Sequence, residues 1–195
     1  VKATGTIGVA GLAGCSTGYQ GPAQQATGTQ DGEQLPLAGA PEVVDVHEQN
    51  NQVTLRSVTS RPAAHPGDSM GGPVELPAVW AWQADDRTPS VPGPVIRTVE
   101  GEDIEVTLDN TDAMHPHTLH FHGVRKTWEN DGVPTTTGVT VEAGETHTYD
   151  IPANVPGTHL YHCHYQTHRH IDMGMYGILR VDPKGYEPAD REFFM

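Results

Sequence analysis

The chain of 195 residues has little basic charge, few cysteines and no long apolar run. Its 11 Lys and Arg residues stand against 25 Asp and Glu, and the net charge of −14 argues against nucleic acid as a partner. No apolar run reaches the roughly 18 residues that a membrane-spanning helix needs. Two cysteines cannot form a disulfide framework. These features favour a single acidic globular domain.

Glycine and proline are abundant instead, with 22 and 16 residues, and turn signals separate short β-type runs. The expected strands are 43–46, 53–58, 79–82, 95–99, 103–108, 118–121, 139–141, 146–151, 159–164 and 178–181. Many short strands at this spacing are typical of an all-β, antiparallel Greek-key sandwich. No segment shows a convincing helical period. The sequence therefore predicts one β-sandwich domain over residues 41–183.

The N-terminal segment is predicted to lie outside this domain. Residues 1–15 are small and apolar, and the tetrapeptide LAGC that ends at Cys15 resembles a lipobox, in which the cysteine is lipidated after export. The alternative is a flexible tail with an incidental cysteine. Residues 16–40 are rich in Gly, Gln and Thr without a period, which predicts a disordered tether. We expect an exported protein, lipid-anchored to the cell surface through Cys15.

Histidine is concentrated in two windows. Nine of the 12 histidines fall within residues 115–123 and 159–175. Leu, Phe and Tyr lie between them at strand spacing, which argues against a solvated histidine-rich loop. The two windows therefore indicate metal binding.

Side chains alternate between the two faces of a strand, and this alternation divides the candidate ligands. His162 and His164 point to one face, whereas Cys163 between them points to the other. His120 and His122 share a face, and His117, three residues before His120, falls on the opposite one. The pattern predicts His117 with Cys163 on one side and four histidines on the other.

Each side suits copper for its own reason. Two histidines and one cysteine with a weak axial methionine are the ligand set of a blue-copper site. Zinc is disfavoured because there is one cysteine here and no CxxC motif. On the other face, four imidazoles without a carboxylate suit copper in a site that is open to a small molecule.

Four motifs extend this pattern along the chain. They are PGPVIR at 92–97, HFHG at 120–123, DGVP at 131–134 and YHCHYQTH at 161–168. Together they resemble the cupredoxin domains of multicopper oxidases, over roughly residues 78–182. HFHG and YHCHYQTH are the specific ones, and the latter is similar to the signature of small laccases.

The resemblance implies a cupredoxin fold and a copper-dependent oxidoreductase. It assigns His117 and Cys163 to a type 1 copper, which accepts electrons from a small-molecule or protein donor. A type 2/type 3 copper site that reduces O2 would take His120, His122, His162 and His164. Covalent bonds from Cys163 to its neighbours His162 and His164 would give a short electron path between the two sites.

The second type 1 histidine is ambiguous. The family spacing Cys-x4-His-x4-Met fits Cys163 with His168 and Met173. The axial methionine usually follows a glycine, however, and this fits Met175 with His170. We favour His170 and Met175 and keep His168 and Met173 as the alternative.

The resemblance also bears on partners and on competing functions. The family's trinuclear cluster takes eight histidines from two domains, so we expect a homo-oligomer or a second cupredoxin domain. Residues 184–195 are either a tail or the start of such a domain. One alternative function is copper nitrite reduction, but that family typically has Asp in place of His120 and Ala in place of His164. Others are a blue-copper electron carrier without a catalytic site and copper storage.

The remaining candidates are weaker. His115 is expected to shape the loop before a strand, and His147 to be a surface strand residue. Trp80 and Trp82 are expected in the core. Asp131 is read as a solvated turn residue rather than a proton relay.

Overall fold

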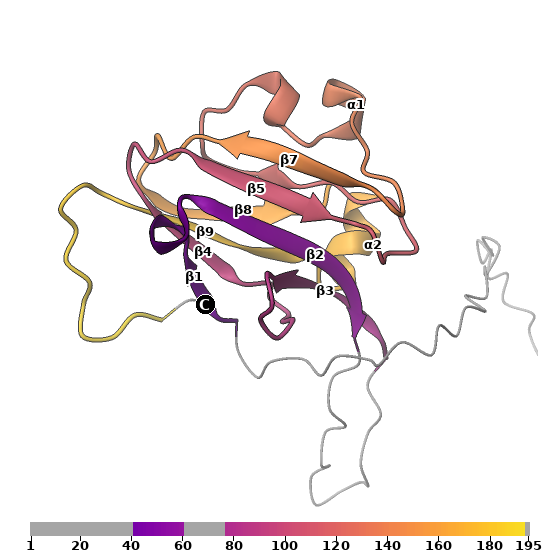
Figure 1. Cartoon of the computed structure of the whole chain (residues 1–195), viewed down its shortest axis with the longest axis horizontal. Helices are drawn as coiled ribbons and strands as arrows, with labels where there is room; N and C mark the ends of the chain where they lie inside the picture. Colours follow the sequence, from indigo (N-terminus) through magenta and orange to yellow (C-terminus); the bar gives the residue numbers. More distant parts are fainter. Residues whose placement is uncertain (1–40, 61–76, 194–195) are drawn as a thin grey trace, which may run out of the picture. The chain divides into compact units, whose positions relative to one another are not determined.

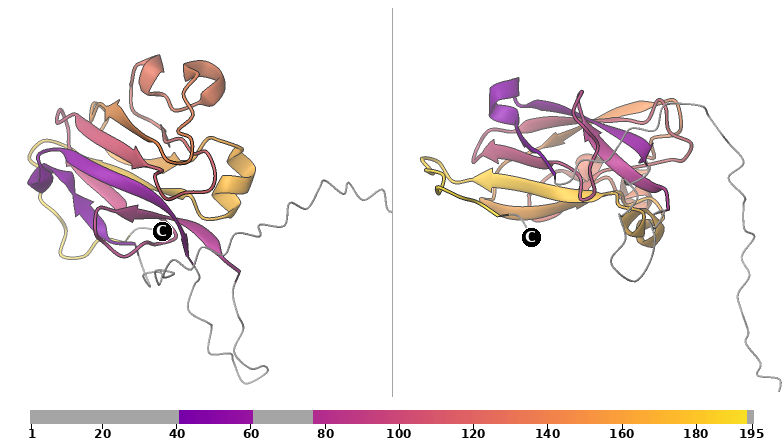
Figure 2. Two further views of the ribbon diagram at one scale, coloured as in Figure 1. Left: turned by 45° about the vertical axis from the view of Figure 1, so that its right-hand side comes forward. Right: turned by 90° about the horizontal axis from the view of Figure 1, so that it is seen from below.

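The structure, a computed structural model, describes residues 41–60 and 77–193. The predicted signal segment 1–15 and tether 16–40 lie outside the described residues. The described part of the chain is mostly β-structure, arranged as two facing sheets (Figures 1 and 2). This confirms the predicted all-β sandwich.

Each sheet combines strands that are far apart in the sequence. One sheet has the order β1 (Val43–Asp45), β4 (Val95–Val99), β9 (Tyr176–Asp182), β8 (Gly157–His162) and β6 (His120–Phe121). The other has the order β3 (Val79–Ala84), β2 (Gln52–Ser60), β5 (Ile104–Asp109) and β7 (Thr146–Ile151). The right-hand view of Figure 2 shows the two layers edge-on.

The expectation of a purely antiparallel sandwich is wrong. Three strand pairs are parallel, namely β1 with β4, β4 with β9, and β2 with β5. Parallel neighbours need a long crossover, and these crossovers carry the chain from one sheet to the other. The antiparallel pair β6–β8 brings the two histidine windows together.

The expected strands near the histidines are shorter than predicted or absent, and the strand expected over 118–121 is reduced to β6. The strand expected to continue to His164 ends at His162, because the His164 N–H donates to the Thr118 hydroxyl oxygen at 3.0 Å instead of to a neighbouring strand. The run 139–141 forms no strand and makes one isolated bridge, in which Val141 and His117 exchange two backbone hydrogen bonds of 3.0 Å.

Short helices occur where none was expected. They are η1 (Val46–Gln49), η2 (Trp128–Asn130), α1 (Pro134–Thr137) and α2 (Thr167–Asp172). Six residues or fewer leave too little sequence for an apolar period to develop, so pattern analysis missed them. None of the helices in the described ranges has the length and apolar character needed to span a bilayer.

The core lies between the two sheets. Trp82, Phe121 and Tyr161 are fully buried there, and the rings of Phe121 and Tyr161 have centroids 5.5 Å apart. The Tyr161 hydroxyl donates to the Pro94 carbonyl oxygen at 2.8 Å, which ties β8 to the segment before β4. Trp80 is 8% exposed, so both tryptophans belong to the core as expected.

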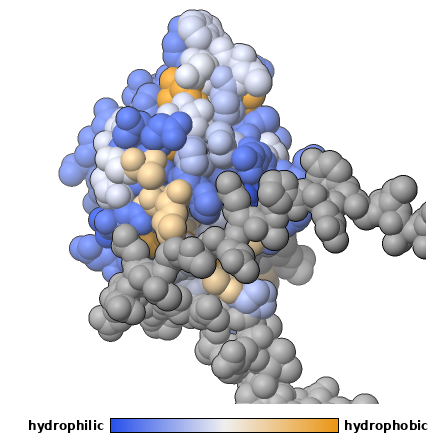
Figure 3. Space-filling model, turned by 90° about the vertical axis from the view of Figure 1, so that its right-hand side faces the viewer, coloured by the Kyte–Doolittle hydropathy of each residue, from blue (hydrophilic) through white to orange (hydrophobic). Residues whose placement is uncertain are grey.

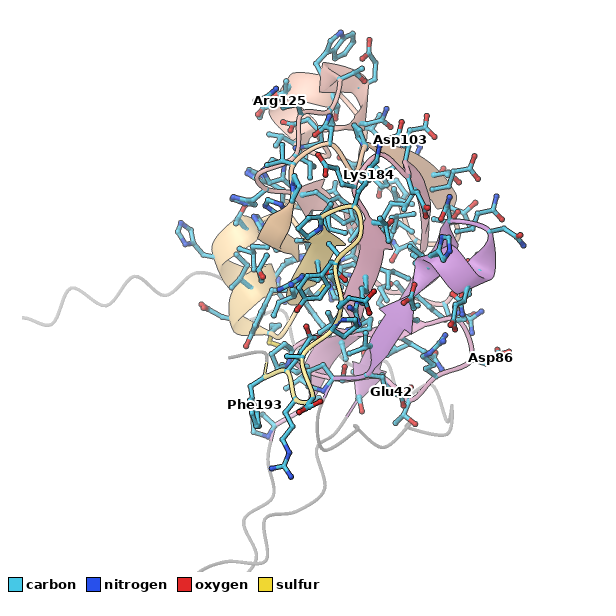
Figure 4. All side chains as sticks on the ribbon, turned by 90° about the vertical axis from the view of Figure 1, so that its left-hand side faces the viewer. Glu42, Asp86, Asp103, Arg125, Lys184 and Phe193 are labelled. Carbon is cyan, nitrogen blue, oxygen red and sulfur yellow. The ribbon has the colours of Figure 1, made fainter. Side chains whose placement is uncertain are left out.

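Charged side chains lie at the periphery, as the five charged residues labelled in Figure 4 show. Residues 183–193 form no strand. In this segment the Tyr186 hydroxyl donates to the Glu192 carboxylate at 2.7 Å, and Glu192 lies 3.7 Å from the Arg97 guanidinium. The described part of the C-terminal segment therefore contacts the sandwich.

The Tyr161 hydrogen bond gives a test of the fold. Tyr161→Phe leaves the buried Pro94 carbonyl without its donor, and we expect a loss of about 1–2 kcal/mol of unfolding free energy. Tyr176→Phe on the partly exposed neighbouring strand should change it by less than about 0.5 kcal/mol. Urea denaturation of the metal-free chain measures both, and equal effects would contradict this role of Tyr161.

Candidate metal centres

The first group of possible ligands consists of His117, Cys163 and His170. Their ligand atoms all lie within 4.8 Å of one another, and all three residues are buried. The Cys163 sulfur is 3.1 Å from His170 Nδ1 and 3.7 Å from His117 Nδ1, and the two Nδ1 atoms are 3.1 Å apart. Two imidazole nitrogens and one sulfur thus converge on one point.

Backbone contacts fix each of these side chains. The bridge to Val141 holds His117 just before β6. Cys163 directly follows β8, and its N–H donates to the Met175 carbonyl oxygen at 3.0 Å. Between these two residues the chain forms α2, which carries His170 back toward the sulfur. The segment from Cys163 to Met175 is therefore a closed loop with both ends held together.

The two pairs of candidates that the sequence left open lie in different surroundings. His170 belongs to the group, whereas His168, two residues earlier on α2, is exposed. Met175 is fully buried, and its backbone contacts that of Cys163. Met173 is partly buried and packs against the core.

Burial keeps both imidazoles of this group neutral. It lowers the pKa of His117 to about 3, with smaller contributions from His170 and His115. It lowers the pKa of His170 to about 4, with help from the Arg169 charge. Burial raises the pKa of the Cys163 thiol to about 11. Neutral imidazoles offer lone pairs to a metal, and the thiol must lose its proton to bind one.

A second group consists of His120, His122 and His162, again with ligand atoms within 4.8 Å of one another. His120 and His162 face each other across the β6–β8 pair. The Nε2 atoms of His122 and His162 are 2.9 Å apart. His162 is buried, His120 half-buried and His122 exposed, so this group reaches the surface.

Backbone carbonyls orient two of these imidazoles. The His120 Nδ1 lies 2.6 Å from the Asp131 carbonyl oxygen, and the His162 Nδ1 lies 2.8 Å from the Cys163 carbonyl oxygen. A carbonyl accepts a hydrogen bond, so Nδ1 carries the proton in both rings and Nε2 has the free lone pair. Burial lowers the pKa of His120 to about 4 and also lowers that of His162.

His164 lies beside this group rather than within it. Its ring centroid is 5.2 Å from that of His120 and 5.6 Å from that of His162. Its Nδ1 is 3.3 Å from the Thr167 hydroxyl. The structure thus gathers all four histidines predicted for this face, three of them with ligand atoms within one small volume.

The two groups meet at Cys163. Its side chain joins the first group, while its carbonyl oxygen contacts the His162 ring of the second. His162 and His164 are its neighbours along the chain. The backbone around Cys163 is therefore a covalent link between the groups.

Several residues at these groups were not predicted. Thr118 donates its N–H toward the Cys163 sulfur at 3.4 Å and accepts the His164 N–H through its hydroxyl. Trp80 was expected only as core but lies against both imidazoles of the first group. The Asp131 carboxylate is 3.4 Å from His120 Nδ1 and 2.9 Å from Lys126 Nζ, so its turn contacts the second group. Three-dimensional contacts of this kind leave no motif in the sequence.

Two other predicted positions lie outside the ligand groups. His115 is partly buried and packs its ring 4.8 Å from that of Trp80. His147 lies on β7, where its half-buried ring contacts Tyr149.

A β-sandwich with one buried Cys–His group and a second all-histidine group defines a copper protein of the cupredoxin type. The family model for multicopper oxidases matches residues 84–185, slightly more than half of the chain. The chain belongs to the multicopper oxidase family, as its motifs predicted, and copper is the cofactor of that family.

Individual relatives include oxidases and nitrite reductases. An L-ascorbate oxidase from Brassica rapa subsp. pekinensis is 39% identical over 94 residues, which is 47% of this chain and 16% of the oxidase. A copper-containing nitrite reductase from Neisseria meningitidis is 34% identical over 119 residues, which is 60% of this chain and 28% of the reductase.

The similar solved structures are also multicopper oxidases and copper nitrite reductases. The crystal structure of a multicopper oxidase matches with a TM-score of 0.57 and 33% identity, over 71% of this chain and 45% of that protein. A copper nitrite reductase from Nitrosomonas europaea matches with a TM-score of 0.55 and 35% identity, over 73% of this chain and 46% of that protein. The chain thus spans less than half the length of these relatives.

The residues present fit copper. The first group offers a soft sulfur and two neutral nitrogens within a buried volume. The second offers His120 and His162, whose Nδ1 atoms carry the proton and leave the Nε2 lone pair for a metal. Cys163 is a buried free cysteine.

Proton release tests this ligand chemistry. At pH 7.5 the thiol is protonated and the imidazoles are neutral, so adding one equivalent of Cu(I) without oxygen should release about one proton, from Cys163. The measurement uses an indicator dye and a Cys15→Ser background, which removes the other cysteine. A double variant that also carries Cys163→Ser should release no proton when Cu(I) is added. Release that persists in this double variant would show that the proton comes from another group.

Proposed function

We propose that this chain is a domain of a copper oxidase in which His117, Cys163, His170 and Met175 bind a type 1 copper. A type 2/type 3 site would take His120, His122, His162 and His164. Copper at the first group would accept single electrons from a reducing substrate, and O2 would be reduced at the second. His168 and Met173 are the less favoured alternatives at the first group.

The observation that carries the proposal is the division of ligands around Cys163. Its sulfur lies 3.1 Å from His170 Nδ1, and its carbonyl oxygen lies 2.8 Å from His162 Nδ1. Electrons that arrive at the sulfur therefore have a covalent and hydrogen-bonded path of a few bonds to the second group. An electron carrier with one copper does not need the histidines at the end of this path.

Exposure distinguishes the roles of the two groups. The first is closed, with His117 3% and His170 1% exposed, which suits a centre that exchanges only electrons. The second is open at His122, where a small molecule such as O2 can enter. Lys126 and Asp131 lie at this opening, 2.9 Å apart, and are available to hold a proton near His120.

The proposal includes a partner for the second group. The four histidines of this chain are half of the eight that the trinuclear cluster of the family takes. We propose that a second cupredoxin domain or a second copy of the chain, in a homo-oligomer, supplies the others across the exposed edge at β6. An isologous two-fold contact brings the same face of each copy together.

Location is a further part of the proposal. Multicopper oxidases generally work outside the cytoplasm, and the LAGC tetrapeptide fits an exported lipoprotein anchored at Cys15. The electron donor is proposed to be a small molecule or a protein.

Nitrite reduction is the second candidate because nitrite reductases are among the relatives at 34–35% identity. Their active site typically has Asp and Ala where this chain has His120 and His164. Two additional imidazoles favour oxygen chemistry over nitrite. Oxygen uptake and nitrite consumption by the copper-loaded chain, measured side by side with copper content and oligomeric mass, decide between the two candidates and an electron carrier.

Cys163→Ser tests the first group. Removing the thiolate should abolish the intense visible absorption of a copper–thiolate centre, because a hydroxyl is a poor ligand for this site. Absorption spectra of the copper-loaded variant give the answer. A variant that stays blue would rule out Cys163 as the ligand.

His164→Ala tests the second group independently. We expect it to keep the visible absorption of the first group and to lose oxygen uptake by at least about tenfold, the scale of effect expected for losing a metal ligand's contribution. His147→Ala, on β7 outside both ligand groups, serves as the matched control and should keep both properties. Loss of colour in His164→Ala would refute the separation of the two groups.

A further inference from the structure

Trp80 on β3 covers the first ligand group. Its ring centroid lies 4.9 Å from that of His170 and 5.9 Å from that of His117, in edge contacts with interplanar angles of 71° and 75°. Its backbone N–H donates to the Met173 carbonyl oxygen at 2.9 Å, which holds β3 against the end of α2. One indole therefore contacts both imidazoles, and a backbone hydrogen bond fixes its place.

Arg169 packs on the same indole. Its guanidinium carbon is 5.0 Å from the centroid of the Trp80 ring, within the range of a cation–π contact. Arg169 is exposed and directly precedes the buried His170 on α2. The two ring distances place the guanidinium within about 10 Å of the His170 ring. Figure 3 shows this end of the domain, where hydrophilic residues surround small hydrophobic patches.

We propose that Trp80 is a positioning residue for the copper of the first group and that Arg169, held on Trp80, raises the reduction potential of that copper. The inference rests on the proposed function. When a donor loses one electron and Cu(II) becomes Cu(I), the positive charge at the group falls by one unit. A fixed positive charge nearby therefore favours the reduced state.

The surroundings make this charge effective. Both imidazoles are almost completely buried beneath the indole, and burial in a medium of low polarity strengthens electrostatic interactions. The Arg169 guanidinium lies over the same indole that contacts both imidazoles, so its charge is held close to the group.

The size of the effect follows from Coulomb's law. Arg169 is exposed, so its effective dielectric constant lies between about 20, typical of pairs near a protein surface, and about 80 for water. With a value of about 35, two unit charges about 10 Å apart change the ratio of Cu(I) to Cu(II) affinity by roughly fivefold. For a one-electron couple this corresponds to about 40 mV. Salt should screen it, since the Debye length falls from about 10 Å at 0.1 M to about 3 Å at 1 M.

The experiment compares Arg169→Gln with Arg191→Gln, which removes the same charge from an exposed position in the C-terminal segment. Redox titration of the copper-loaded full chain follows the visible copper–thiolate absorption. Arg169→Gln should lower the Cu(I)/Cu(II) affinity ratio about fivefold at 0.1 M salt and much less at 1 M. Arg191→Gln should have the same Cu(I)/Cu(II) affinity ratio as the unmodified chain. Equal potentials in the two variants would overturn the role of Arg169.

Trp80 is tested by the rate at which a chelator removes Cu(II). Trp80→Ala opens the group to water and should speed removal at least several-fold, while Trp80→Phe, which keeps a ring over the imidazoles, should restore most of the protection. Removal that is no faster in Trp80→Ala would overturn the positioning role. If Trp80→Ala does not fold, the reduction potential of Trp80→Phe is measured instead. A Phe ring holds the guanidinium more weakly than an indole does, so the potential should fall in the same direction as in Arg169→Gln, and an unchanged potential would overturn the role of Trp80.

These outcomes are separate from failure of the proposed function. A copper-loaded unmodified chain without copper–thiolate absorption would refute both proposals before any variant is compared. A blue chain whose potential and chelator resistance do not respond to Arg169 or Trp80 would refute this inference alone.

Discussion

The alternation of side chains around Cys163 is the constraint on which the rest of the site depends. The strand β8 ends at His162, but Cys163 and His164 directly after it keep the alternation of a strand, because the sulfur and the two flanking imidazoles lie on different sides. In this chain the sulfur joins His117 and His170 inside the sandwich, while His162 and His164 turn toward β6. The separation into a closed and an open group follows from three consecutive residues.

Burial explains why these ligands are ready for a metal. The sheets surround the first group so completely that the imidazoles stay neutral far below their usual pKa, and the thiol keeps its proton well above its own. In the second group, carbonyl oxygens of Asp131 and Cys163 fix the ring tautomers. Each group is therefore held by contacts that the fold itself supplies.

Much of this arrangement could be read from the sequence, and the reasons for the exceptions are physical. Strand parity and the two histidine windows depend on local spacing, so the pairing of His117 with Cys163 was accessible. Spacing favoured His170 over His168 but left both open, because the position of each imidazole depends on which face of the short helix α2 meets the sulfur. The parallel strand pairs and the contact of Trp80 with two imidazoles arise from packing between distant segments, which local patterns do not encode.

The closed loop from Cys163 to Met175 has a consequence for engineering. It holds a sulfur, the buried His170 and the buried Met175 in one short continuous segment whose two ends are joined by a backbone hydrogen bond. Such a segment can be transferred to another protein in one piece. A different sandwich that offered one imidazole at the place of His117, and an indole at that of Trp80, could receive most of a metal-binding pocket through a single graft.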